Sequence, residues 1–272
     1  MRPRLARRRE HLVEKISDLV AGEKITHQSV WQCDNSKQME NQSAELAGHE
    51  QACARVAARF PQRWLGGYVR GKLRRDPIYP AAWDLLCSSS EPILDVGCGV
   101  GLLAFYLRER GCRQPVLGLD LDARKIRHGS RIAADCYENV ELRCQDVQGA
   151  LPDFSGNIAL LDVLHYLPRA KQCELLSHLA GCVAPGGMLI VRDCPPDGGP
   201  RFWLTWFAEK FAQMVSWNLN TPLCFPSRAS IEENFNAAEF KCETRPLWGA
   251  SPFNNHIFIF RRCAPKTVPV AG

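Results

Sequence analysis

Three glycines stand at every second position directly after an apolar run that carries one carboxylate. The stretch is "ILDVGCGVGLLAFYL", residues 93–107, in which Asp95 is followed by Gly97, Gly99 and Gly101. Residues without a Cβ let a ligand approach the backbone closely, and parallel sheets bind ligands where a strand turns into a helix. The stretch therefore predicts a small-molecule site at such a turn, although a glycine-rich turn alone is a weak signal.

Two later carboxylates make this prediction more specific. Asp120 ends the next apolar run, nineteen residues after Gly101, where a carboxylate can accept hydrogen bonds from both hydroxyls of a ribose. Asp146 follows the third run, in "LRCQDV", where it can accept from an exocyclic amine. Together with Asp95 they predict a pocket for a nucleoside that bears a second polar group. The alternative is that Asp95 only holds the turn and that Asp146 is an ordinary loop residue.

The elements that must position these residues alternate along the chain. Strands are predicted for "PILDVG", "PVLGLD", "VELRC", "NIALLD" and "GMLIVRD", and helices for "LLAFYLRER", "DARKIRHGSRIAAD" and "RAKQCELLSHLAGCV". We expect Gly111 to end the first helix and Asp122 to cap the second. Apolar strands separated by helices indicate a parallel sheet covered on both faces. "KCETRPLWG" and "HIFIFRR" have no helix between them and predict an antiparallel pair at one edge.

As a set, these motifs resemble those of the class I S-adenosylmethionine-dependent methyltransferases. The matching stretches are "ILDVGCGVGLLA", "VLGLDLD", "CQDV", "ALLDVLHYL" and "APGGMLIVRD", which cover about residues 92–193, and the closing strand pair extends the match to about residue 262. The resemblance implies a doubly wound, Rossmann-like α/β fold with a seven-stranded sheet, mostly parallel with an antiparallel last strand. It also implies S-adenosylmethionine as the cofactor and methyl transfer as the reaction.

The resemblance further implies a cofactor site at the carboxyl ends of the first four strands. Its residues are Asp95, Gly97, Gly99, Gly101, Asp120, Leu121, Asp146, Val147, Leu161 and Asp162. In this assignment Asp95 supports the methionine amino end, directly or through water. Asp120 binds the ribose diol, and Asp146 meets the adenine amine. Leu161 and Asp162 lie near the sulfonium.

His165 and Tyr166, in "DVLHYLP" just past the fourth strand, are the candidate catalytic residues that would face the methyl acceptor. Methyl transfer requires alignment, exclusion of water and, for a protonated acceptor, a base. His165 is the candidate base because its ordinary pKa lies near neutrality, and the alternative is a packing role for it. The stretch lacks the N/D-P-P-Y/F signature that the resemblance associates with methylation of amide or nucleobase nitrogens, which disfavours a nucleic-acid acceptor.

An aromatic stripe follows the fifth strand in "RFWLTWFAEKFAQMVSW", residues 201–217. Five apolar side chains fall at helical spacing on one face: Trp203, Trp206, Phe207, Phe211 and Met214. Such a stripe is more often part of the core, and the alternative is a cover over an aromatic or acyl acceptor.

The chain is expected to contain four parts. Residues 1–58 form a basic and polar extension that is partly disordered, and 59–91 form a helical cover. Residues 92–264 form the methyltransferase domain, with 201–238 as an acceptor-covering insertion, and 265–272 form a tail. We expect the fold to begin near residue 55.

A narrower resemblance concerns "QRWLGGYVRGKLRRDPIYPAAWDLL", residues 62–86, and "PLWGASPFNN". Both are similar to segments of the methyltransferases found beside aryl-polyene and fatty-acid-like pathways. This resemblance implies a lipid-like or aromatic acceptor, which an acyl carrier protein can tether. The basic residues of 63–77 are then either a contact surface for an acidic partner or the polar side of an ordinary surface helix.

Composition sets further limits. A formal net charge of +5 among 272 residues does not demand a nucleic-acid partner. The chain has neither an apolar run long enough for a membrane span nor a secretory signal, so a cytoplasmic protein is expected. Thirteen cysteines without C-x-x-C or zinc-finger spacing predict reduced thiols and no metal site. The remaining alternatives are a non-catalytic cofactor-binding regulator or assembly protein, a nicotinamide-dependent dehydrogenase and an RNA methyltransferase.

Overall fold

The computed structural model describes residues 43–149, 151–214, 222–249 and 252–264. The chain divides into two compact units, residues 1–50 and residues 51–272. In the first unit the described residues, 43–50, are helical. The second unit contains every strand of the sheet and all the predicted site residues.

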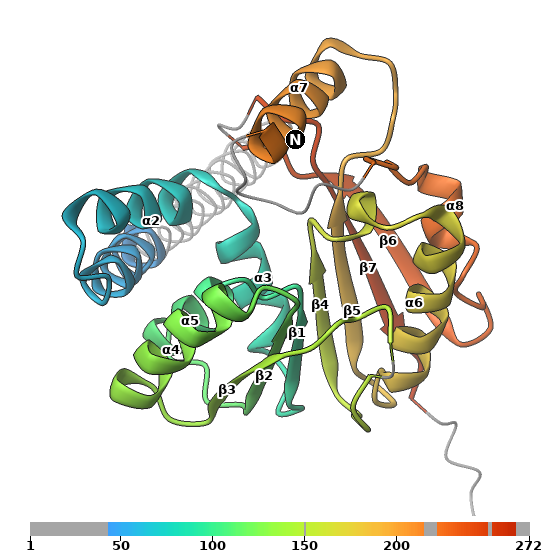
Figure 1. Ribbon diagram of the computed structural model, residues 1–272. Helices are drawn as coiled ribbons and strands as arrows, with labels where there is room; N and C mark the ends of the chain where they lie inside the picture. The colour runs from blue at the N-terminus through green and yellow to red at the C-terminus, as the bar shows by residue number, and fades with distance from the viewer. Residues whose placement is uncertain (1–42, 150, 215–221, 250–251, 265–272) are drawn as a thin grey trace, which may run out of the picture. The chain divides into compact units, whose positions relative to one another are not determined.

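A seven-stranded sheet forms the centre of the second unit, in the order β3-β2-β1-β4-β5-β7-β6 (Figure 1). The strands are β1 Ile93–Val96, β2 Val116–Asp120, β3 Val140–Cys144, β4 Asn157–Leu161, β5 Met188–Asp193, β6 Phe240–Pro246 and β7 His256–Arg262. The first five strands pair in parallel, and β7 is antiparallel to both β5 and β6. This confirms the predicted fold class, including the antiparallel last strand.

Helices connect and cover these strands (Figure 1). They are α2 Arg63–Arg75, α3 Ile78–Leu86, α4 Leu102–Glu109, α5 Ala123–Cys136, the 3₁₀ turn η1 Leu164–Tyr166, α6 Arg169–Cys182, α7 Pro200–Met214 and α8 Arg228–Glu232. None of the helices in the described ranges combines the length and apolar character that a membrane span requires.

The sheet is buried on both faces, as its continuous apolar strands predict. Successive residues of β1 belong to different cores: Ile93 packs with side chains of α3, α4 and α5, and Leu94 packs with side chains of α6 and α8. Because β1 pairs with both β2 and β4, the strand order reverses between β1 and β4. In doubly wound folds, ligands bind at the carboxyl ends of the strands at this reversal.

The packed part of the chain begins earlier than the sequence predicts. Residues 43–58 are helical, and Ala52, Cys53 and Val56 have no exposed surface. Within "QACARVAAR" these three side chains fall on one helical face, an apolar stripe too short to stand out beside the polar stretch before it. The part of the expected extension at residues 43–58 is therefore helical, and packing begins at Ala52, before residue 55. The basic segment at residues 1–42 lies outside the described residues.

Five cysteines that lie among apolar residues in the sequence, a context that favours burial, differ in their exposure in the structure. Cys98 and Cys182 are buried, Cys87 and Cys136 are half-buried, and Cys144 is exposed. Cys144 is the last residue of β3, which is one of the two edge strands of the sheet. An edge strand has a neighbour on one side only, so an apolar sequence context did not ensure burial there.

Candidate functional site

The glycine turn follows β1 and is held against the end of β2. The backbone N–H groups of Gly97 and Cys98 both donate to the carbonyl oxygen of Leu119, at 2.7 and 3.0 Å. Gly97, Gly99 and Gly101 have φ values of +79°, +59° and +84°, in the left-handed region that favours glycine. The turn therefore requires glycine for its backbone conformation at all three positions.

Space around the three glycines differs. A Cβ at Gly97 would lie 2.3 Å from Cγ2 of Val163, and one at Gly101 would lie 2.9 Å from a methyl group of Leu142. A Cβ at Gly99 would have no heavy atom within 4 Å. Neighbouring side chains therefore leave no room for a Cβ at Gly97 and Gly101. The Gly99 backbone instead faces open space that a ligand can occupy.

Asp95 lies beneath this turn in a buried environment. Its side chain is buried, and Oδ2 has no hydrogen-bond partner among the described residues. Burial, together with the nearby charge of Asp120, raises the pKa of Asp95 to about 7. An unpartnered buried carboxylate oxygen is costly, and a cationic amino group placed beside it would remove this cost.

Asp120 makes two backbone hydrogen bonds that the sequence did not predict. Oδ2 accepts from the N–H of Gly99 and Oδ1 from the N–H of Asp122, both at 2.8 Å. The side chain thus joins the glycine turn to the start of α5. Each carboxylate oxygen can accept a second hydrogen bond, so these contacts leave capacity for a ribose diol. Asp122 caps α5, as predicted, by accepting from the N–H groups of Arg124 and Lys125.

Asp146 is exposed, and its Oδ1 accepts from the backbone N–H of Gln148 at 2.9 Å. The backbone N–H of Gln145 donates to the carbonyl oxygen of Asp120 at 3.0 Å. This contact places the segment containing Asp146 and the half-buried Val147 beside the end of β2, where the exposed Leu121 also lies. The structure therefore brings the Asp120 and Asp146 segments together.

The residues after β4 are fixed by a buried arginine at the end of β5. Asp162 has a φ of +58°, unusual for a residue other than glycine. Both of its carboxylate oxygens pair with the guanidinium of Arg192, through Nε at 2.8 Å and through Nη2. Arg192 also pairs with Asp76 at the end of α2. Both carboxylate oxygens of Asp162 are thus paired with Arg192, whereas Leu161 and the Asp162 backbone lie at the end of β4.

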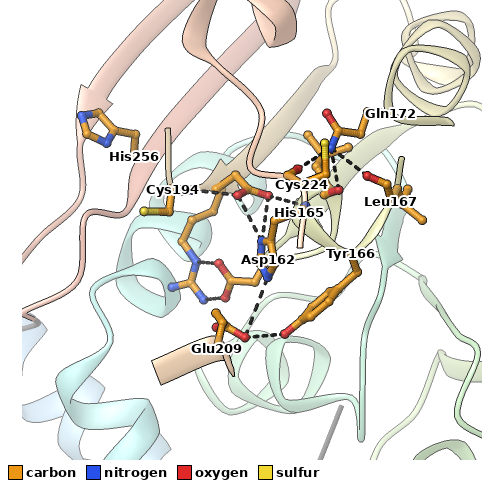
Figure 2. Close-up of polar contacts among 12 residues, drawn as sticks. Asp162, His165, Tyr166, Leu167, Gln172, Cys194, Glu209, Cys224 and His256 are labelled. Carbon is orange, nitrogen blue, oxygen red and sulfur yellow. Dashed lines mark hydrogen bonds and ion pairs between the residues drawn. The ribbon is translucent and has the colours of Figure 1, made fainter. Parts of the chain in front are cut away.

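His165 lies in η1 with its ring almost completely buried (Figure 2). Nδ1 is 3.1 Å from Oδ1 and 3.2 Å from Oδ2 of Asp193, and the ring stacks on Phe225 with centroids 5.1 Å apart. The backbone carbonyl of His165 accepts from the N–H of Cys224 at 2.8 Å. The imidazole is therefore held in one orientation by a carboxylate, an aromatic ring and a backbone hydrogen bond.

The other ring nitrogen of His165 faces Glu209 of α7 (Figure 2). Nε2 lies 3.9 Å from Oε2 of Glu209 and has no hydrogen-bond partner among the described residues. The same oxygen accepts the phenol of Tyr166 at 2.5 Å. Burial, followed by the charge of Glu209, raises the pKa of Tyr166 above its usual range. The phenol therefore stays protonated and acts as a hydrogen-bond donor.

Electrostatics favour the protonated form of His165. Burial alone lowers the pKa of an imidazole, but the charge and hydrogen bond of Asp193, with Glu209 and Asp162 further away, outweigh it. The resulting pKa is about 9. Neither Asp193 nor Glu209 was singled out from the sequence. Asp193 could have been found as the carboxylate that ends the fifth predicted strand, whereas nothing in the sequence connects Glu209 with His165.

The aromatic stripe of α7 is only partly buried, whereas stripes of this kind are more often part of the core. Trp203 is 51% exposed and Phe207 is 62% exposed, whereas Phe202 is buried. Phe202 contacts Phe225 edge-on, so the face of α7 that packs inward is adjacent to the predicted stripe rather than the stripe itself. The side chains of Phe211 and Met214 lie outside the described part of the chain.

Comparisons with known proteins identify relatives of this chain. A family model described as a methyltransferase domain matches residues 93–187. An uncharacterised methyltransferase of Mycobacterium bovis is 31% identical over 150 residues, which cover 52% of this chain and 72% of the relative. Erythromycin 3''-O-methyltransferase of Saccharopolyspora erythraea is 30% identical over 129 residues, covering 42% of this chain and 40% of that enzyme. This chain thus matches less than half of the erythromycin enzyme's length.

Among solved structures, an O-methyltransferase family protein from Burkholderia thailandensis has a similar fold. Its TM-score is 0.56 at 18% sequence identity, with 70% of this chain and 56% of that chain covered. The pyocyanin biosynthetic protein PhzM gives a TM-score of 0.55 at 16% identity, covering 76% of this chain and 60% of that one. At such low identity these structures confirm the fold alone.

Proposed function

The chain belongs to the class I S-adenosylmethionine-dependent methyltransferases, and from this premise we propose that it methylates a small molecule at a hydroxyl beside His165 and Tyr166. When bound, S-adenosylmethionine supplies an electrophilic methyl group on a sulfonium. The observation that carries the acceptor-side proposal is the buried Asp193–His165 pair at the carboxyl ends of β4 and β5. The name of the erythromycin relative, which denotes O-methylation of a small molecule, supports an oxygen acceptor.

The residues of the glycine turn fit this cofactor. The open space at Gly99 allows a ligand to lie against the backbone, and the unpartnered Oδ2 of Asp95 suits the amino group of the methionine part. We propose that Asp120 and Leu121 hold the ribose and that Asp146 and Val147 hold the adenine. Gly97 and Gly101 are proposed to shape the turn.

The end of β4 is the proposed location of the reacting centre. There the Asp162 carboxylate is paired with the guanidinium of Arg192, and the Asp162 backbone N–H donates to the carbonyl oxygen of Arg192 at 2.9 Å. This pairing supports a positioning role for Asp162, in which the guanidinium fixes the strained backbone of the residue.

On the acceptor side, we propose that Nε2 of His165 takes the proton of the acceptor hydroxyl. Because Nδ1 is held by Asp193, Nε2 is the nitrogen that can accept it. Tyr166 and Glu209 are proposed to orient the hydroxyl. The pKa of about 9 means that His165 is protonated at neutral pH. Removal of this proton, by rising pH or by a neighbouring positive charge, is therefore required before His165 can act as a base.

The acceptor class is proposed from the two helices that carry exposed aromatic side chains. Trp64 of α2 is 69% exposed, and Phe207 of α7 is 62% exposed. We propose that residues 59–91 and 201–238 cover an aromatic or acyl acceptor, and that an acyl carrier protein can deliver it to the basic surface of α2. The contact between Asp76 and Arg192 supports this arrangement because it ties the end of α2 to the end of β5.

Two experiments test the proposed function. Calorimetry with S-adenosylmethionine and S-adenosylhomocysteine should show binding, and incubation with labelled cofactor and a host extract should yield a labelled small molecule. His165→Ala should lower turnover on that acceptor about 10²-fold, the scale of general-base catalysis, with cofactor affinity unchanged. His178→Ala, at an exposed position of α6, is the matched control. Cofactor binding without any labelled product would favour the non-catalytic alternative, and an unchanged rate in His165→Ala would return His165 to a packing role.

A further inference from the structure

A cavity of about 570 Å³ lies away from the candidate site, at the end of the sheet where β1 and β2 begin. Its wall combines the end of α3 with the segment between α4 and β2, and it includes two cysteines, Cys87 and Cys112. Arg110 and Arg113 also line it. A cavity with two thiols and two cationic side chains has a chemistry that the methyl transfer does not use.

Hydrogen bonds join the two segments that carry these thiols. The side chain of Gln114 donates to the carbonyl oxygen of Ser89, and its Oε1 accepts from the thiol of Cys112 at 2.7 Å. On the other side, the indole N–H of Trp83 donates to the carbonyl oxygen of Arg110 at 3.2 Å. These hydrogen bonds hold the segment that carries Cys87 beside the segment that carries Cys112.

The two thiols are chemically different. A hydrogen bond from Cys87 to Cys112 raises the pKa of Cys87 and lowers the pKa of Cys112. The charge of Arg108, whose guanidinium donates to the backbone carbonyl of Cys112 at 2.8 Å, also lowers the pKa of Cys112. The thiolate is the nucleophilic form of cysteine, so Cys112 is the thiol prepared to react first and Cys87 is its neighbouring second thiol.

We propose that Cys87 and Cys112 are a redox-active dithiol, which a hydroperoxide entering the cavity oxidises to an intramolecular disulfide. The Cys112 thiolate attacks the peroxide, the O–O bond breaks, and Cys112 becomes a sulfenic acid while hydroxide leaves. Cys87 then attacks the sulfenic sulfur, and its proton leaves with the hydroxyl group as water. With hydrogen peroxide, two thiols and one peroxide give one disulfide and two molecules of water. A dithiol reductant returns the disulfide to two thiols by thiol–disulfide exchange and is itself oxidised to a disulfide.

The test uses the full chain, reduced and then treated with one equivalent of hydrogen peroxide. Unreacted thiols are alkylated, and peptides are mapped by mass spectrometry without reduction. The expected result is the loss of two titratable thiols per chain and a linked peptide pair that contains Cys87 and Cys112. Dithiothreitol should restore both thiols.

Single variants identify the roles of the two cysteines. Cys87→Ser should leave Cys112 as a sulfenic acid that dimedone traps, whereas Cys112→Ser should prevent oxidation at position 87. Cys242→Ser, at an exposed position of β6, should behave like the unaltered chain. Linkage of a different pair, or oxidation spread over the exposed cysteines with Cys112 still reduced, would overturn the proposal. The mapping of the unaltered chain decides this even if a variant fails to fold.

Discussion

Nδ1 of His165 lies 3.1 Å from Oδ1 of Asp193, and both side chains are almost completely excluded from solvent. The carboxylate also accepts the backbone N–H groups of His165 and Cys194, at 3.3 and 2.8 Å. Asp193 thus fixes the turn after β4 to the end of β5 and at the same time directs Nε2 of the imidazole away from β5. A proton that reaches Nε2 forms an imidazolium next to a buried carboxylate, which stabilises it.

The first prediction concerns the pH dependence of turnover. Because His165 has a pKa of about 9 and acts as a base only when neutral, kcat/KM should rise with pH and level off above about pH 9. Asp193→Asn removes the charge that raises this pKa, so the rise should move toward the ordinary histidine value of about 6.5. The measurement is a pH–rate profile of both proteins, with circular dichroism to confirm folding. A profile that does not move would assign the titration to another group.

The second prediction concerns Asp95 and the pH dependence of cofactor affinity. With a pKa of about 7, the carboxyl group is neutral in mild acid and charged above neutrality, where it can pair with an amino group. Cofactor binding should therefore weaken as the pH falls from 8 to 6. At pH 8, Asp95→Asn should weaken binding by about 1.5–3 kcal/mol, the scale of a hydrogen bond to a charged group. Calorimetry at several pH values should give a flat profile for this variant, and an equal slope in both proteins would contradict the assignment.

Sequence reasoning recovered what local patterns determine. The Asp122 cap, the left-handed Gly111 after α4 and the antiparallel pairing of β7 follow from residue type and apolar spacing, and each is confirmed. The strain at Asp162 and the contact between Glu209 and Tyr166 were not predictable. Residues 166 and 209 meet only because α7 folds back over η1, and no single-sequence pattern encodes that approach. Asp120 was predicted as a site residue because it ends the second strand. Its hydrogen bonds to two backbone N–H groups were not predictable, because they depend on the path of the glycine turn.

The third prediction concerns Gly99, the glycine of the turn at which a side chain would meet open space. Gly99→Val should abolish cofactor binding, because its side chain would enter the open space beside the turn. The matched control is Gly111→Val, which has the same left-handed conformation and open surroundings but lies after α4. Both variants carry the backbone strain, so only Gly99→Val should lose the calorimetric signal. Loss in both would point to strain in the fold instead of a blocked site.

Asp120→Ala, the fourth prediction, should weaken cofactor binding by about 1.5–3 kcal/mol, since a charged acceptor of hydrogen bonds is lost. It also leaves the N–H groups of Gly99 and Asp122 without their acceptor. A fall in the urea midpoint should therefore accompany the weaker binding. Asp135→Ala, on α5 away from the turn, is the control for removal of a carboxylate. Normal affinity in Asp120→Ala would exclude the ribose assignment.

The last prediction concerns the basic surface of α2. Arg74 and Arg75 are exposed at the end of this helix, where an acidic carrier protein could contact them. Reversing both charges, Arg74→Glu with Arg75→Glu, should lower turnover on a carrier-bound acceptor and flatten its dependence on salt, because exposed charge interactions are screened by ions. The same change on α5, Arg127→Glu with Arg131→Glu, alters the net charge equally at two exposed positions and should have little effect. The assay compares an acyl carrier protein loaded with an aromatic acid against the same acid as a free thioester. An equal loss of turnover on both acceptors would indicate damage to the cover over the site. Unchanged turnover on the carrier-bound acceptor would show that this surface of α2 does not bind a carrier protein.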